Sequence, residues 1–247
     1  MESASLHKGF TVIEVILFFT ISGLMLFGMM IGMSGSINRQ RYDEVSSSLL
    51  DYLQSQYNLN DNVRNDRPSN VACDGGSTSE ARGWSDCTIA GRIVYSIDGR
   101  QIQSRPVYAM SDGDDNLVAD EPAFLASLGL IVAPDTLAGE NDAYTVLWQT
   151  KLYTDKGSQD VQNDFSVLIL RLPNNGLTRT YVSESGYTGG SLDTLIGSTL
   201  ETLNLCVQPG GLTSAPATGV RVLGGASSSN GVQAIPARSD GSGACAE

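Results

Sequence analysis

Hydrophobic side chains fill the first part of the chain and then recur at a helical period. Residues 10–33 are almost entirely apolar, and Glu14 is the one charged residue among them. About 20 apolar residues are enough to cross a bilayer, so this segment can span one. Between residues 42 and 57, apolar positions recur every three or four residues, which predicts an amphipathic helix with one buried face. This face comprises Tyr42, Val45, Leu49, Leu50, Leu53 and Tyr57.

Both segments belong to one predicted helix. No proline occurs from the start of the apolar run to Pro68, and the polar residues 58–62 mark the helix end. We therefore expect a helix of about 50 residues. Its apolar half covers residues 10–36. Its amphipathic half, residues 37–62, needs a partner surface in the domain that follows.

Short β-rich runs follow from residue 92 onward. Asp98-Gly99 separates two such runs and predicts a hairpin with a two-residue turn. Asn175-Gly176 predicts a second hairpin. Residues 144–153 alternate between apolar and polar, which predicts a single strand. The apolar positions of this strand, on one face or on neighbouring faces, are Tyr144, Val146, Trp148 and Leu152.

Two short helices and two weak strands complete the expected elements. One helix spans 121–128, capped by Asp120 and closed by Gly129, and the other spans 192–203. The weak strands lie in a tail rich in Gly, Ser and Ala, at 220–223 and 232–235.

The order of these elements predicts an α+β fold. A long helix comes first, and antiparallel strands with inserted short helices follow it. In such a fold the amphipathic half of the helix packs on one face of an antiparallel sheet. The globular head then comprises residues 63–247.

Charge and histidine content exclude several classes of function. The net charge is −12 with a pI near 4.4, whereas a nucleic-acid surface needs clustered Lys and Arg. His7 is the only histidine, and it precedes the apolar run. If this leader is removed, catalysis that needs histidine and histidine-ligated metal sites are both excluded. No paired acidic motif stands out either, so we do not expect an enzyme.

The four cysteines predict two disulfides. None belongs to a Cys-x-x-Cys pair, so zinc and thioredoxin-type sites have little support. An even number beside an export-like N-terminal segment is typical of proteins outside the cytosol, where disulfides form. We favour the two local pairs, Cys73–Cys87 and Cys206–Cys245, over the other connectivities. Four buried free thiols are the alternative.

The residues around Glu14 match a known N-terminal signal. The stretch KGFTVIEV places Lys8-Gly9 before Phe10 and makes Glu14 the fifth residue counted from Phe10. In this the chain resembles the type IV prepilins and the pseudopilins of type II secretion. Their short polar leader ends in Lys/Arg-Gly, and an apolar helix with Glu at the fifth mature position follows. The resemblance covers the N-terminal segment only.

The resemblance implies how the chain is processed. A prepilin peptidase cuts between Gly9 and Phe10, so that residues 1–9 are a leader, and the same enzyme methylates the new amine of Phe10. Before assembly, the chain is a single-pass membrane protein in contact with lipid. Lys8 ahead of the span and an acidic domain beyond it place the N-terminus in the cytoplasm. The inner-membrane assembly machinery then moves the chain into an extracellular pilus, among copies of itself and other pilins.

The resemblance also gives Glu14 a role. Glu14 pairs in the filament with the Phe10 amine of a neighbouring subunit. An unpaired carboxylate is costly in an apolar core, and a partner charge removes most of that cost and selects the axial register. The alternative is a plain membrane anchor that tolerates a glutamate. One departure from many type IV pilins is the absence of a proline within the helix; instead, helix-weakening glycines occur at Gly23, Gly28, Gly32 and Gly35.

An acidic loop is the only candidate cofactor-binding site, and the cofactor would be calcium. The loop lacks the glycine and the terminal glutamate that a calcium-binding loop has at its sixth and twelfth positions. A solvated acidic loop is therefore favoured. The candidate ligands are Asp112, Asp114, Asn116 and Asp120.

Three functions compete on these grounds. The leading one is a major or minor pilin of an extracellular filament that serves adhesion, motility or DNA uptake. The second is a pseudopilin of a type II secretion system, which carries the same signal. The third is a minor pilin specialised for DNA uptake. It requires a basic surface patch, which the net charge of −12 does not suggest.

Overall fold

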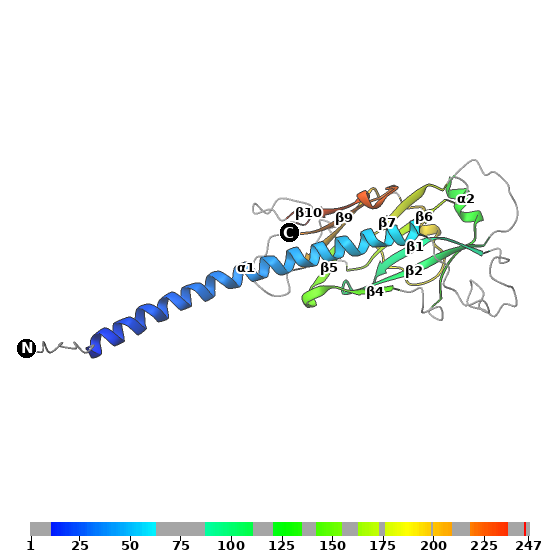
Figure 1. Cartoon of the computed structure of the whole chain (residues 1–247). Coiled ribbons are helices and arrows are strands. Elements are labelled where there is room, and N and C mark those ends of the chain that lie inside the picture. Colours follow the sequence, from blue (N-terminus) through cyan, green and yellow to red (C-terminus); the bar gives the residue numbers. More distant parts are fainter. Residues whose placement is uncertain are drawn as a thin grey trace, which may run out of the picture. The chain divides into compact units, whose positions relative to one another are not determined.

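The computed structural model (Figure 1) describes most of the chain. The described residues are 11–62, 87–110, 121–134, 142–154, 163–172, 176–198, 200–208 and 218–236, together with Cys245. The chain divides into two compact units, residues 1–41 and residues 42–247.

A single helix, α1, spans Val12–Asp61, and its 50 residues agree with the expected length. Within the first unit, its large hydrophobic side chains from Val12 to Met33 are exposed wherever they are described. The stretch Val12–Met30 is long and apolar enough to cross a membrane, and none of it is buried. Its length and composition fit either a membrane span or a signal segment.

The second unit contains two antiparallel sheets. The larger has the order β3-β2-β1-β6-β7, and β4 also pairs with β2. The smaller has the order β10-β9-β8-β5. The strands of the larger sheet are β1 (Cys87–Ser96), β2 (Gln101–Met110), β3 (Leu130–Val132), β4 (Asp142–Thr145), β6 (Phe165–Arg171) and β7 (Thr178–Ser183). Those of the smaller sheet are β5 (Lys151–Thr154), β8 (Thr202–Gln208), β9 (Gly219–Leu223) and β10 (Val232–Ile235).

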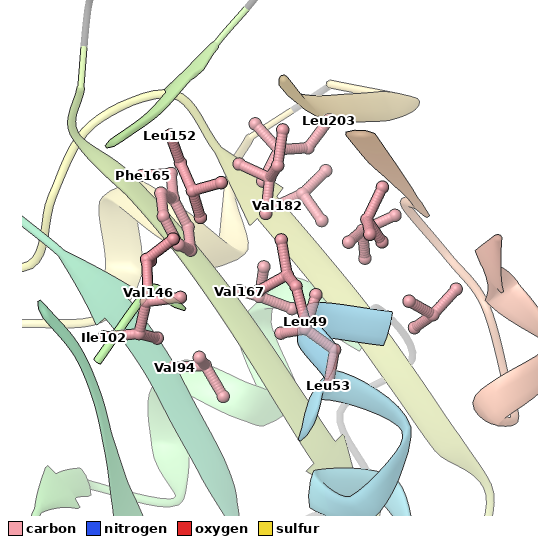
Figure 2. Close-up of a cluster of buried hydrophobic side chains, with 14 of the residues drawn as sticks. Leu49, Leu53, Val94, Ile102, Val146, Leu152, Phe165, Val167, Val182 and Leu203 are labelled. Atoms are coloured by element: carbon pink, nitrogen blue, oxygen red, sulfur yellow. The ribbon is translucent and has the colours of Figure 1, made fainter. Parts of the chain in front are cut away.

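The second half of α1 packs against both sheets, and this confirms the α+β fold. Five of the six residues of the predicted apolar face are buried, and Leu50 is partly buried. Leu49 and Leu53 point into a cluster with side chains of the larger sheet, as Figure 2 shows. The cluster also takes residues from the smaller sheet, among them Leu203, Val220 and Val222.

Polar contacts fix the helix at defined points on the sheets. The hydroxyls of Ser46 and Thr218 lie 3.0 Å apart in the interior. Further along the helix, Gln56 is fully buried and its Oε1 accepts hydrogen bonds from Arg92 Nε at 3.1 Å and from Ser104 Oγ at 2.7 Å. Its Nε2 donates to Asp142 Oδ2 at 3.3 Å. Because buried polar groups need partners, these bonds select one position of the helix.

A second core lies between the larger sheet and two short helices. These are α2 (Glu121–Ser127) and α3 (Asp193–Ile196). Leu125, Leu195 and Ile196 pack there with residues of β1, β2 and β6. The helix expected at 192–203 is therefore too long: α3 ends at Ile196, and Thr202 already begins β8.

The strand expected at 144–153 is broken in the structure. β4 pairs with β2 in the larger sheet, whereas β5 pairs with β8 in the smaller one. A short 3-10 turn, η1 (Leu147–Gln149), joins them, and Trp148 and Gln149 both have positive φ, 56° and 57°. The chain changes sheets here, so one continuous strand is impossible. Trp148 is accordingly 52% exposed and does not share an inward face with Val146 and Leu152.

Both predicted hairpins are present, although the first has a longer turn than expected. β1 and β2 are joined by the four residues 97–100, because Asp98 Oδ1 accepts bonds from the amides of Arg100 and Gln101 at 2.8 Å. Gly99 has φ +68° in this turn. The second hairpin joins β6 and β7, with Gly176 at φ +70°. The weak strands expected in the tail are β9 and β10.

The edge strands β5 and β7 are bonded by neighbouring loops. The Leu152 amide on β5 donates to the Gly99 carbonyl of the β1–β2 turn at 2.8 Å. On β7, the carbonyl of Thr180 accepts from the Gly225 amide at 2.7 Å, and the carbonyl of Val182 accepts from Ser198 Oγ at 2.9 Å. β5 and β7 each pair with one neighbouring strand. These bonds involve backbone groups of β5 and β7 that do not take part in that pairing.

Candidate functional site

Glu14 closes a capping box at the start of α1. The backbone N–H and the hydroxyl of Thr11 both donate to Glu14 Oε2, each at 3.1 Å. The Thr11 hydroxyl oxygen in turn accepts from the Glu14 N–H at 3.4 Å. This reciprocal arrangement satisfies backbone donors that the first turn of a helix leaves unpaired. Glu14 therefore has a local partner within a single chain.

The capping box is a role of Glu14 that the sequence analysis missed. Its signal is visible in the sequence as Thr11-Val12-Ile13-Glu14, a Thr followed by a Glu three positions later. Because an unpaired carboxylate is costly in an apolar core, the sequence suggested only a partner in a neighbouring subunit. Both bonds from Thr11 reach the same oxygen, Oε2. A carboxylate accepts at both of its oxygens, so a second donor can still be bound.

An apolar surface surrounds this carboxylate. The side chains on its side of the helix are those of Ile13, Leu17, Phe18, Ile21, Ser22 and Met25. The five hydrophobic ones are exposed in the single chain. Exposed apolar area costs about 25 cal/mol per Å² in water, so a surface of this kind needs lipid or another protein against it.

Several predicted site residues lie outside the described part of the chain. These include Gly9 and Phe10 of the expected cleavage site and Cys73 with the side chain of its expected partner Cys87. The four calcium candidates, Asp112, Asp114, Asn116 and Asp120, also lie outside it. Among the described residues, no group of three or more His, Cys, Asp or Glu side chains is placed to hold a metal ion.

The second favoured cysteine pair is present as a disulfide. Cys206 on β8 is bonded to Cys245; their Cα atoms are 5.4 Å apart, and the two residues are 39 positions apart in the sequence. Both are buried beside Ile235, and the Tyr153 hydroxyl donates to the Cys245 carbonyl at 3.4 Å. A disulfide indicates an extracytoplasmic head, because the cytosol keeps thiols reduced.

A second feature missed by the sequence analysis is the contact between Trp148 and Glu44. The indole Nε1–H of Trp148 donates to Glu44 Oε2 on α1 at 3.0 Å. The backbone of Trp148 and Gln149 is left-handed without a glycine, so no residue type marks the break in advance. In the structure Val146 and Leu152 on either side are buried, whereas the side chain of Trp148 is exposed.

Comparison with known proteins does not assign a family. No family model, no characterised protein and no solved structure matches this chain. What the chain does must therefore be argued from its own residues: one apolar helix with a capped carboxylate in its first turn, and a disulfide-containing α+β head.

Proposed function

We propose that this chain is a structural subunit, a major or minor pilin, of a type IV pilus-like extracellular filament, and that it has no enzymatic activity. The observation that carries the proposal is Glu14 in the first turn of an exposed apolar helix, four positions after the Phe10 of Lys8-Gly9-Phe10. This arrangement is what the prepilin signal requires. The head would then serve adhesion, motility or DNA uptake at the filament surface.

The described hydrophobic side chains of residues 12–33 are exposed, whereas the apolar face of α1 is buried from Tyr42 onward. This difference supports a role of the first segment in assembly. The buried face of α1 begins at Tyr42, and the core of the head uses no described side chain from residues 12–33. The exposed apolar surface is therefore not needed to fold the head. Lipid would cover it before assembly, and the helices of neighbouring subunits would cover it in the filament.

The capping box and the proposed intermolecular pair are compatible. Thr11 occupies one carboxylate oxygen of Glu14, and the other can accept the methylated amine of Phe10 from a neighbouring subunit. Cleavage at the Gly9–Phe10 bond creates that amine. The buried pair then selects the axial register, because any other register leaves two charges without partners.

Three variants distinguish the two roles of Glu14. Glu14→Gln keeps a side chain that serves in a capping box but removes the counter-charge. Thr11→Val removes the hydroxyl of the box and keeps the charge. Glu14→Ala removes both. An uncompensated buried charge costs about 3–5 kcal/mol, so the two Glu14 variants should be excluded from filaments, while Thr11→Val should enter them close to the wild-type level.

The measurement compares the membrane pool with the sheared filament fraction of the same cells. All variants should be present in the membrane, because removal of a carboxylate eases insertion. Mass spectrometry of the filament fraction should find an N-methylated Phe10 at its N-terminus. Retention of Met1 in assembled material would contradict the proposal, and so would normal assembly of Glu14→Gln together with exclusion of Thr11→Val. A processed chain found only in a periplasmic secretion complex would instead identify a type II pseudopilin.

A further inference from the structure

The capping box fixes the residue at which α1 begins. Thr11 directly precedes the helix, and its carbonyl accepts a helical bond from the Val15 N–H at 3.3 Å. The N–H and the hydroxyl of Thr11 both donate to Glu14 Oε2, each at 3.1 Å. A residue that caps a helix in this way has a non-helical backbone, so it marks the N-terminal limit of the helix.

This limit lies just beyond the bond that the proposed function requires to be cut. The bond joins Gly9 to Phe10, the residue before Thr11. Its hydrolysis adds water at the Gly9 carbonyl carbon, which becomes a carboxylate, while the Phe10 nitrogen leaves as an amine. Peptidases cut backbone that is locally open. With Thr11 as the cap, the helical bonds begin at the Thr11 carbonyl, two residues after the carbonyl that is attacked.

Gly9 is the nearest alternative cap. Glycine is among the preferred N-cap residues, whereas Phe10 has no capping group. Without the Thr11 hydroxyl, unravelling of the first turn would leave backbone N–H groups unpaired in the apolar segment, which is costly in lipid. Extension of the helix to Gly9 would instead pair the N–H groups of Ile13 and Glu14. The carbonyl that water must attack would then accept a helical bond, and the scissile bond would be protected.

We propose that Thr11 is a positioning residue for the cleavage of this chain. By starting α1 at Val12, it keeps the bond between Gly9 and Phe10 outside the helix, where a peptidase can reach it. The proposal rests on the proposed function, because a processed N-terminus is part of that function. Thr11 acts through the start of the helix and needs no contact with the peptidase.

Cleavage rates of the full-length chain test this role. Each variant would be incubated with membranes that contain a prepilin peptidase, and loss of residues 1–9 would be followed by mass spectrometry. Thr11→Val should slow cleavage by about fivefold, the factor that corresponds to the usual contribution of one N-cap. Thr11→Ser keeps a capping hydroxyl and should be cleaved at the wild-type rate. Thr20→Val is the matched control, because the Thr20 hydroxyl donates to the Leu17 carbonyl at 2.9 Å and caps nothing.

A second substitution separates the start of the helix from recognition of the hydroxyl by the peptidase. Proline fits the first helical position, here Val12, and disfavours a helical conformation in the residue before it. In a Val12→Pro background the helix start no longer depends on the hydroxyl. Thr11→Val should then slow cleavage by less than about twofold, relative to Val12→Pro alone. The same slowing in both backgrounds would show that the peptidase reads the hydroxyl, and would overturn the proposal.

Failure of this proposal is distinguishable from failure of the proposed function. Slow cleavage still yields mature chain, so Thr11→Val should reach the filaments at steady state. Equal cleavage rates for the wild type and Thr11→Val would overturn the positioning role and leave the filament assay of the Glu14 variants unaffected. A wild-type chain that is not cut between Gly9 and Phe10 would overturn both.

Discussion

The hydroxyl of Tyr57 on α1 lies 2.8 Å from the hydroxyl of Thr180 on β7, and both residues are buried. Thr180 Oγ1 also donates to the Ala226 carbonyl at 2.9 Å. Since a hydroxyl has one proton, Tyr57 must be the donor in the first bond. One short chain of hydrogen bonds therefore joins the helix, the larger sheet and the loop after β9.

Tyr57→Phe should lower the free energy of unfolding by about 1 kcal/mol, the usual net value of a hydrogen bond. The loss is limited because Thr180 keeps its bond to Ala226. Chemical denaturation of the purified protein measures it. Tyr187→Phe is a control, because the Tyr187 hydroxyl donates to the Gly190 carbonyl at an exposed site. A loss from Tyr187→Phe as large as that from Tyr57→Phe would contradict this account of the buried bond.

Alkaline pH should destabilise the head. Burial raises the pKa of the Tyr57 hydroxyl, although its bond to Thr180 opposes the shift. Burial likewise raises the pKa of Tyr144. With a raised folded-state pKa, the contribution to stability is complete below the unfolded value of about 10 and is lost as pH rises above it. Unfolding free energies measured from pH 8 upward should decline from about pH 10, and less steeply in Tyr57→Phe. A flat profile in the wild type would refute this.

A fragment that begins at Asn38 should be a soluble monomer. It lacks the exposed apolar surface of residues 12–33 and keeps the buried face from Tyr42 onward. Size-exclusion chromatography with light scattering, under oxidising conditions, gives its mass. Aggregation of a fragment with both disulfides formed would show that the head needs the first half of α1.

Gly91→Ala should destabilise the head by about 2–4 kcal/mol. A Cβ at this position would lie 2.1 Å from the Ile169 carbonyl oxygen on the neighbouring strand β6. The backbone cannot yield without losing the β1–β6 ladder, which begins at this residue. Thr88→Ala, an exposed position on the same strand, should change stability by less than about 0.5 kcal/mol. Thermal unfolding of both variants checks the difference, and equal melting temperatures would contradict the close approach.

Peptide mapping without reduction should find no free thiol in the native protein. It should find Cys206 joined to Cys245, and Cys73 joined to Cys87 as the sequence predicts. Removal of the Cys206–Cys245 bond by paired Cys→Ser changes should cost about 2–4 kcal/mol, because the bond closes a long segment. Alkylation of four cysteines in the folded protein would contradict the export argument. An unchanged melting temperature on reduction would show that the tail is held by packing alone.

The periodicity of α1 was sufficient to predict its length and its buried face, because both depend on local spacing along one helix. The division of the strands between two sheets was not predictable in the same way. The pattern of residues 144–153 predicts one strand, yet β4 and β5 belong to different sheets. Which strand pairs with which depends on contacts far apart in the sequence, for example Leu152 with Val207. Alternation within one segment carries no information about them.

The candidate site was likewise predictable only in part. Glu14 stood out because one carboxylate in an apolar run is conspicuous, whereas its bond to Thr11 required attention to a four-residue pattern. The exposure of Trp148 follows from two left-handed residues that carry ordinary side chains. A sequence gives no warning of such strain, since the tertiary structure imposes it.

The bonds between loops and the edge strands β5 and β7 matter when many heads are packed close together. Open strand edges template pairing with other chains, and the risk rises with local concentration. Here a turn of one sheet bonds to the edge strand of the other through Leu152 and Gly99, and loops bond to Thr180 and Val182. Where such heads are crowded together, a neighbour that approaches β5 or β7 meets backbone groups that are already bonded, so that contact at these two edges is decided by side chains on the surface.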